Sequence, residues 1–353
     1  MLSHNKFLSF NRETIHLGIR SGILGTILSL WFVLSGSNNV ALIQAILGMF
    51  IVSIIEAAAL TFTVKTRLII TTIFCFLAGF AGFIGCAIAD NFLLLSLILL
   101  IFTFMVGVTS SETDLTAISS LFIANVVIVN SGFPASTKDS FIYAASFTLG
   151  GLSLVFFSYI HSLFYYVKYS TKDLLIYRQR KIFNYEERDI LFAIRISVAV
   201  FLANAISHFF NLPEGYWAPM TALLILKIDH DFSWERISHR FFGTIWGSVL
   251  AIILISIIHS KVVLAFLMFP ALFFIVISIA KHYGAYVFFL TAMVTILFNM
   301  INDYGTRITK ERILDTVLGV AAVILVIYLF MPLSRMRRKQ NNHDSKPRNN
   351  IQV

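Results

Sequence analysis

The sequence predicts an all-α polytopic membrane protein, with about twelve transmembrane helices in two parallel six-helix repeats. Apolar residues make up 58% of the 353 residues, charged residues only 13%, and the mean hydropathy is +0.83. A soluble domain carries about 25% charged residues. Polar residues also recur at a nearly fixed offset: Arg20 and Arg195 at 175, then Glu56 and Asp229, Arg67 and Arg240, and Thr71 and Thr244 at 173. Such an internal repeat is typical of membrane transporters.

Twelve apolar segments approach the roughly 20 residues that a hydrocarbon core of about 30 Å requires. The expected spans are 17–34, 40–63, 68–89, 92–109, 115–132, 141–166, 190–210, 214–229, 241–259, 262–280, 283–301 and 312–332. They divide the chain into a degenerate first repeat, a basic cytoplasmic linker, a second repeat that carries the stronger motifs, and a basic cytoplasmic tail that we expect to be disordered. These regions are 1–166, 167–189, 190–332 and 333–353.

The distribution of basic residues predicts the sidedness. An even number of spans places both termini on the same side of the membrane. If that side is the cytoplasm, only five of the 27 Lys and Arg residues lie outside, and the other 22 lie inside. The positive-inside rule therefore favours cytoplasmic N and C termini. The five outer residues are Lys138, Lys261, Arg307, Lys310 and Arg312.

The residue composition and spacing argue against several classes of function. The 27 basic against 18 acidic residues do not indicate a nucleic-acid partner, because the basic residues lie in short loops between apolar runs, where they face lipid headgroups. Cys75 and Cys86 are eleven residues apart on one helix, about 16 Å, too far for a disulfide. The scattered histidines show neither metal-ligand spacing nor a nucleophile–base motif. We expect no metal, no cofactor and no enzyme activity. The histidines are His208, His230, His239, His259 and His282.

Two aromatic residues open the eighth expected span. Tyr216 and Trp217 follow the turn at 213–215. Their amphipathic rings are of the kind that settle at the membrane interface. A plain interfacial anchor and a contact with an aromatic or apolar substrate are both compatible with this position.

An arginine opens the ninth expected span, and a face of small residues follows it. Gly243, Thr244 and Gly247 lie three, four and seven residues after Arg240. The G-x-x-x-G spacing lets another helix approach closely. This places Arg240 at a helix–helix seam, where it could bind a carboxylate through two parallel hydrogen bonds. The alternative is that its side chain snorkels to the headgroups.

Polar residues also mark the last two expected spans. Arg312, Asp315, Thr316 and Gly319 share one face of the last helix, where Arg312 and Asp315 can pair. A second stripe in the eleventh span either forms interhelical hydrogen bonds or lines a hydrated path. It consists of Thr291, Thr295, Asn299 and Asp303.

These motifs resemble the fusaric-acid-resistance-like family of bacterial membrane transporters, which includes aromatic acid exporters; plant aluminium-activated malate transporters are more distantly similar. The similar pattern is Tyr216-Trp217-Ala218-x-x-Thr221-Ala222, then Arg240-x-x-Gly243-Thr244-x-x-Gly247, then Arg312-Ile313-x-Asp315-Thr316-x-x-Gly319. It covers roughly 190–332. The resemblance implies a multi-pass protein of the bacterial inner membrane that moves organic anions, outward and in exchange for protons.

The leading hypothesis is therefore a secondary exporter of small organic or aromatic acid anions. The alternatives are a passive organic-anion channel and a non-transporting assembly or envelope component. Expected partners are the lipid bilayer, the small organic anion, and either a further copy of the chain or a periplasmic efflux partner. We assign substrate contacts to Arg240, Arg312, Tyr216, Trp217, Thr244 and Asn299, proton coupling to Asp229, Glu56 and Asp315, and helix packing to Gly243, Gly247 and Gly319.

Overall fold

The computed structural model describes residues 12–35, 40–110, 114–164, 187–228, 230–279, 281–302 and 305–344, and every regular element in these ranges is a helix. The first half contains α1 (Arg12–Ser35), α2 (Val40–Ala58) with a 3₁₀ turn η2 (Ala59–Thr61), α3 (Val64–Ile88), α4 (Phe92–Thr109), α5 (Asp114–Asn130) and α6 (Thr137–Phe164). The second half contains α8 (Glu187–Phe209), α9 (Trp217–Ile225), α10 (His230–Ile257), α11 (Lys261–Phe266), α12 (Met268–Ser278), α13 (Tyr283–Asn302) and α14 (Gly305–Asp344).

The helices confirm the predicted class, an all-α multi-pass membrane protein. Ten segments of the described residues are long and apolar enough to cross a bilayer. Large apolar side chains cover their outer surface: Phe80, Leu93 and Trp246, for example, are 60% exposed or more. Soluble proteins rarely expose so much continuous apolar surface, so this surface faces lipid. The count of twelve spans stays a prediction, because α5 and α9 are shorter.

The second helix of the second half differs most from its prediction. Instead of a span over 214–229, α9 has nine residues and is about 13 Å long, less than half the hydrocarbon thickness. All nine residues are buried. The chain leaves the helix at Leu226, which is extended, and the backbone N–H of Lys227 donates to Ser233 Oγ at 3.0 Å. Because other helices enclose α9, its free backbone ends do not face lipid.

Helix boundaries near charged residues and prolines also differ from the predictions. Helix α10 begins at His230 and not near 241, so Arg240 lies inside a helix. The span expected at 262–280 is interrupted between α11 and α12, where Pro270 cannot donate a helical hydrogen bond.

The tail prediction is wrong for residues 333–344. They continue α14, which is 40 residues and about 60 Å long. Pro332 removes one hydrogen bond, but the Leu, Arg, Met, Lys and Gln that follow are good helix formers. The remaining tail, 345–353, and most of the predicted linker, 167–186, lie outside the described residues.

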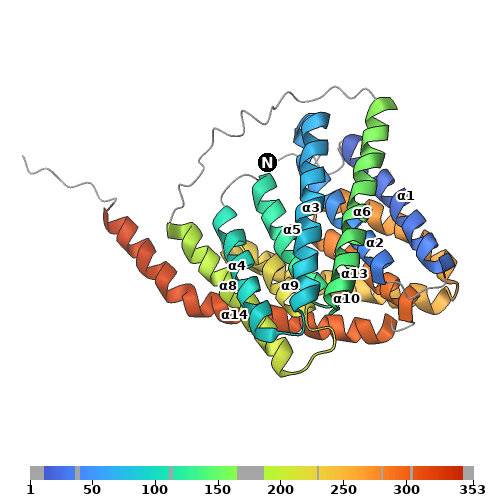
Figure 1. Ribbon diagram of the computed structural model, residues 1–353. Coiled ribbons are helices and arrows are strands. Elements are labelled where there is room, and N and C mark those ends of the chain that lie inside the picture. Colours follow the sequence, from blue (N-terminus) through green and yellow to red (C-terminus); the bar gives the residue numbers. More distant parts are fainter. Residues whose placement is uncertain are drawn as a thin grey trace, which may run out of the picture.

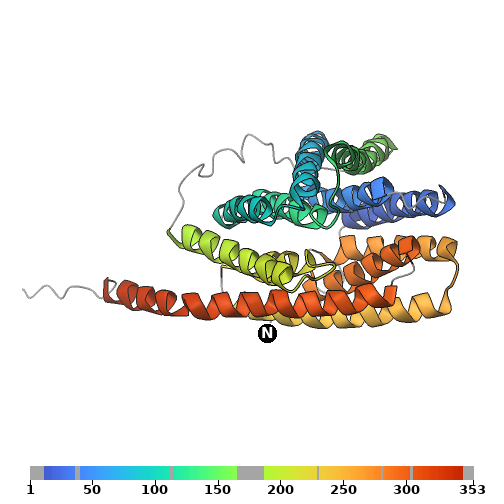
Figure 2. The same ribbon diagram turned by 60° about the horizontal axis from the view of Figure 1, so that its bottom comes forward.

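The two halves form two layers of helices (Figure 1). Figure 2 shows the first half, blue to green, above the second half, yellow to red, with α14 along the lower edge. Two extensive helix contacts join the layers: α4 packs on α8, and α12 packs on α1. When α11 and α12 are counted as one interrupted span, each contact joins the first helix of one half to the fourth helix of the other.

Inside each half, the second helix packs against the last helix. Helix α6 packs on α2 and α14 packs on α9, in each case through a glycine. A Cβ on Gly150 would lie 1.9 Å from the carbonyl oxygen of Ala45, and one on Gly319 would lie 2.6 Å from that of Ala218. Ala45 and Ala218 are 173 residues apart, the predicted repeat offset. The duplication itself stays a prediction, and these contacts support it.

Candidate functional site

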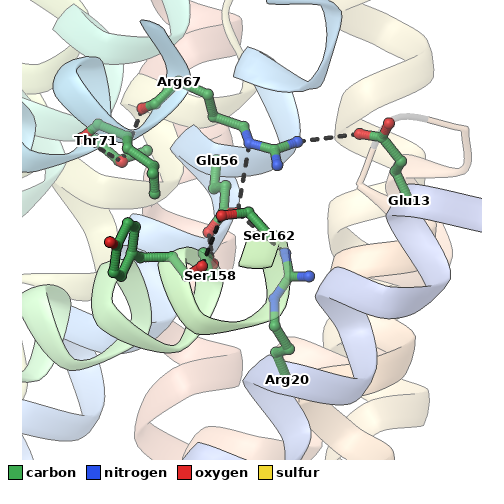
Figure 3. A network of polar contacts seen from close by, with 9 residues as sticks. Glu13, Arg20, Glu56, Arg67, Thr71, Ser158 and Ser162 are labelled. Atoms are coloured by element: carbon green, nitrogen blue, oxygen red, sulfur yellow. Dashed lines mark hydrogen bonds and ion pairs between the residues drawn. The ribbon is translucent and has the colours of Figure 1, made fainter. Parts of the chain in front are cut away.

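In the first half, buried charges neutralise one another around Glu56 (Figure 3). One carboxylate oxygen accepts a hydrogen bond from Arg20 Nη2 at 3.1 Å and lies 3.7 Å from Arg67 Nε. The other accepts from Ser158 Oγ at 2.8 Å. The Glu56 side chain is 1% exposed. This acid is therefore held from three helices, α1, α3 and α6, inside the protein.

A second acid completes the network. Arg67 Nη1 donates to Glu13 Oε2 at 3.0 Å, and Thr71 Oγ1 donates to the carbonyl oxygen of Arg67 at 2.9 Å. Two arginines thus face two carboxylates. An acid ion-paired in this way acts as a fixed counter-charge, and breaking such a buried pair leaves an uncompensated charge.

The second half buries arginines in a different environment. Arg240 is 1% exposed and Arg312 is 2% exposed. Among the described residues, the ion pairs within 4.0 Å all involve other arginines. Arg240 Nη2 donates to Thr221 Oγ1 at 3.4 Å, and the guanidinium carbon of Arg312 lies 4.2 Å from the centre of the Trp217 ring. Both arginines thus contact α9, and their burial excludes snorkelling to headgroups.

The two guanidinium groups lie close together along α9. Trp217 and Thr221 are four residues apart on one face of that helix, a rise of about 6 Å. The groups are near enough for the charge of Arg240 to act on Arg312. Three of their nitrogens, Nε and Nη1 of Arg240 and Nη1 of Arg312, are buried without a hydrogen-bond partner among the described residues. Buried donors are nearly always bonded, so this cluster is exceptional.

Further buried polar groups lie where α10, which carries Arg240, meets α13. Helices α10 and α13 place four hydroxyls in their contact, and none of these has a hydrogen-bond partner among the described residues; Trp217 Nε1 also has none. The hydroxyls belong to Thr244, Ser248, Thr291 and Thr295. Asn299 is buried on the same helix, α13, as Thr291 and Thr295. Each of these groups can donate a hydrogen bond, as anion binding requires.

Close packing by the three predicted glycines sets the positions of these groups. A Cβ on Gly247 would lie 2.3 Å from the carbonyl oxygen of Phe288, and one on Gly243 would lie 2.9 Å from Val287, so both lie where α10 meets α13. Gly319 lies where α14 meets α9. These glycines bring α10 and α14, which carry the two arginines, against their neighbours.

Two predicted arrangements differ in the structure. Tyr216 and Trp217 are 7% and 5% exposed, so neither faces lipid at the interface, and their ring centres are 4.8 Å apart. Asp315 is 1% exposed and lies one turn from Arg312, but these two residues form no ion pair within 4.0 Å, and Asp315 Oδ2 has no hydrogen-bond partner within the described chain. Asp229 lies outside the described residues.

Two cations at the other end of α9 were not among the residues predicted for the site. Arg236 Nη1 donates to the carbonyl oxygen of Leu224 at 3.1 Å, and its guanidinium carbon lies 4.3 Å from the centre of the Tyr283 ring. Lys227 follows the end of α9. No local signal distinguishes these residues from a solvated loop, because the charged run 227–236 contains four acidic or basic neighbours.

Fold and site together define a multi-pass membrane protein with a buried cationic cluster in its second half. Residues 199–326 match the model of the family described as Fusaric acid resistance protein-like, so this part of the chain is similar to that family. The match confirms the resemblance inferred from the three motifs. Arg240 and Arg312 both lie within the matched region.

Relatives agree over a similar length of sequence. An uncharacterized protein of Synechocystis is 26% identical over 146 residues, which is 41% of this chain and 19% of that protein. An uncharacterized protein of Haemophilus influenzae is 30% identical over 142 residues, 39% of this chain and 19% of that protein. The matched part is thus about a fifth of each relative's length. No solved structure matches the chain.

Proposed function

We propose that the protein transports small organic anions across the membrane, with the carboxylate bound between Arg240 and Arg312. The observation that carries the proposal is the burial of two neighbouring guanidinium groups with no carboxylate within 4.0 Å among the described residues. Buried charges that form no ion pair cost several kcal/mol. A substrate carboxylate would offset this cost and use the unbonded nitrogens. The first half is unsuited to the role, because its arginines already have acids.

Aromatic acids fit this site better than short aliphatic acids. The rings of Tyr216 and Trp217 lie beside Arg312 and provide apolar surface next to the positive charge. An aromatic substrate can pack on such rings while its carboxylate reaches the guanidinium groups.

For energy coupling, we propose export of the anion in exchange for protons, with Asp315 as the acid that exchanges them. Its carboxylate is buried within one turn of Arg312 and has an oxygen without a partner among the described residues. Glu56 suits this role less well, since three groups hold its carboxylate. A pH gradient without a substrate gradient should drive uptake into vesicles if protons are coupled. A passive channel would show no such uptake.

The proposed localisation rests on the charge distribution and on the family resemblance. The placement of 22 of the 27 basic residues on one side supports cytoplasmic termini. The family resemblance supports the bacterial inner membrane.

The test of the central site is the initial flux of benzoate into vesicles that contain the full chain. Arg240→Gln and Arg312→Gln each remove a charge-assisted hydrogen-bond donor, so flux below saturation should fall about 10- to 150-fold. Arg12→Gln is the matched control, because Arg12 is exposed at the start of α1. Benzamide, which has no negative charge, should not be transported. The proposal is wrong if both buried variants carry benzoate as fast as Arg12→Gln.

A further inference from the structure

A cavity of about 290 Å³ lies where the two halves meet, separate from the arginine site. Helices α4 and α5 of the first half line it together with α8, α10 and the end of α9. Its walls are mainly apolar, and they include Ile118, Leu121, Phe192 and Leu223. Two cations, Lys227 and Arg236, line the same cavity. An apolar chamber with cationic groups is a common form of ligand pocket.

The structure holds these two cations in place. Arg236 is fixed by its hydrogen bond to the Leu224 carbonyl and by the Tyr283 ring. The backbone of Lys227 is fixed by Ser233, whose hydroxyl accepts from its N–H. Within the described part of the chain, neither side chain has a carboxylate within 4.0 Å. The cavity therefore combines positive charge with apolar walls, and the described chain does not neutralise that charge.

We infer that this cavity is a second binding site, for amphiphilic carboxylates that consist of one acidic group and a one- or two-ring apolar body. A carboxylate would pair with Lys227 and Arg236, and the apolar body would contact Ile118, Leu121 and Phe192. The volume is near the lower limit of small-molecule pockets, roughly 300–1,000 Å³. A nucleotide is too large for it, and an inorganic anion would leave the apolar walls in contact with water.

The position of the cavity relates it to the arginine site. Along α9, Arg312 contacts Trp217, Arg240 contacts Thr221 and Arg236 contacts Leu224. Lys227 follows two residues after the helix ends. The eleven residues from Trp217 to Lys227 thus contact or contain four successive cations. On this assignment, which rests on the proposed function, the cavity holds the anion at a second position on the same transport path. Helices α4 and α5 of the first half then also take part in substrate binding.

The test measures binding of 2-naphthoate to the purified full chain in lipid nanodiscs, independently of flux. Every variant also carries Arg240→Gln, which weakens the central site. Lys227→Gln removes the charge, and Lys65→Gln is its control, because Lys65 is exposed at the start of α3. Ala117→Leu fills the cavity from α5, and Ala87→Leu, at an exposed position on α3, controls for it.

Lys227→Gln should weaken 2-naphthoate binding by about tenfold or more, as loss of a charge-assisted contact predicts. Ala117→Leu should weaken 2-naphthoate more than benzoate, because it reduces the room for the second ring. The inference is overturned if both variants bind as their controls do. If that happens while Arg240→Gln alone still abolishes benzoate flux, the proposed function stands without the cavity. If Lys227-dependent binding appears but no acid is transported, the cavity stands and the proposed function fails.

Discussion

Replacement of Glu56 by Gln tests whether the first-half network is a structural counter-charge. The substitution keeps the size of the side chain but removes the negative charge between Arg20 and Arg67, at a site only 1% exposed. Arg67 keeps Glu13 at 3.0 Å, whereas the ion pair of Arg20 is lost. Breaking a buried pair by removal of one partner costs about 3–5 kcal/mol.

This cost can be converted into a thermal shift. An unfolding entropy of roughly 2 cal/mol/K per residue, applied to 353 residues, gives a fall in the unfolding midpoint of about 4–7 °C. The assay is thermal unfolding of the purified protein in one detergent, followed by tryptophan fluorescence. The double variant Arg20→Met with Glu56→Gln should recover much of the loss, because no charge is then stranded, and coupled neighbours are not additive.

Flux provides the second measurement for Glu56→Gln. At matched amounts of folded protein, benzoate flux should remain near that of the parent, because the network contacts neither Arg240 nor Arg312. An unchanged midpoint would refute the counter-charge argument. Loss of proton-driven flux with an unchanged midpoint would instead assign proton coupling to Glu56.

Three further predictions concern packing, pH and topology. Gly319→Ala places a Cβ 2.6 Å from the Ala218 carbonyl oxygen, so it should destabilise the protein by about 1–3 kcal/mol in thermal unfolding. Gly284→Ala, whose Cβ would meet only the His239 side chain, at 3.3 Å or more, should cost less. Burial, together with the nearby Arg236, lowers the pKa of Lys227 to about 8. Its charged form is therefore lost above that pH, so 2-naphthoate binding in the cavity should weaken as pH rises through about 8, and Lys227→Gln should remove this dependence. Reporter fusions test the sidedness, and a cytoplasmic signal at Asn211 would contradict it. Fusions should report outside at Asn38, Ala89 and Asn211, and inside at Lys172 and Lys339.

The helical class and several boundaries followed from hydropathy. The expected span at 92–109 coincides with α4, because a continuous apolar run there ends at polar residues on both sides. The same signal failed for α9. Its residues are as apolar as those of a span, and hydropathy does not distinguish burial in protein from burial in lipid.

Site geometry was less predictable than the fold. Arg240 was expected at a helix end, since charged residues usually mark span ends, yet α10 begins ten residues earlier. Its burial depends on α9 and α13, which lie far from it in the sequence. The pairing of Glu13 with Arg67 joins residues 54 positions apart, and no local pattern reports it. The three sequence motifs identified residues that lie together in the fold. They did not indicate which of the arginines are paired with a carboxylate.

The reciprocal contacts between the layers, α1 with α12 and α4 with α8, have the form of an isologous dimer interface, in which one surface pairs with its own copy. In a true dimer of identical subunits, every substitution appears twice, so a charge network cannot be closed in one copy and left open in the other. The predicted duplication would remove that constraint, because both copies would then lie in one chain and could differ in sequence. The neutralised Glu56 in one half and, among the described residues, the unpaired Arg240 in the other are a difference that such a fusion would permit.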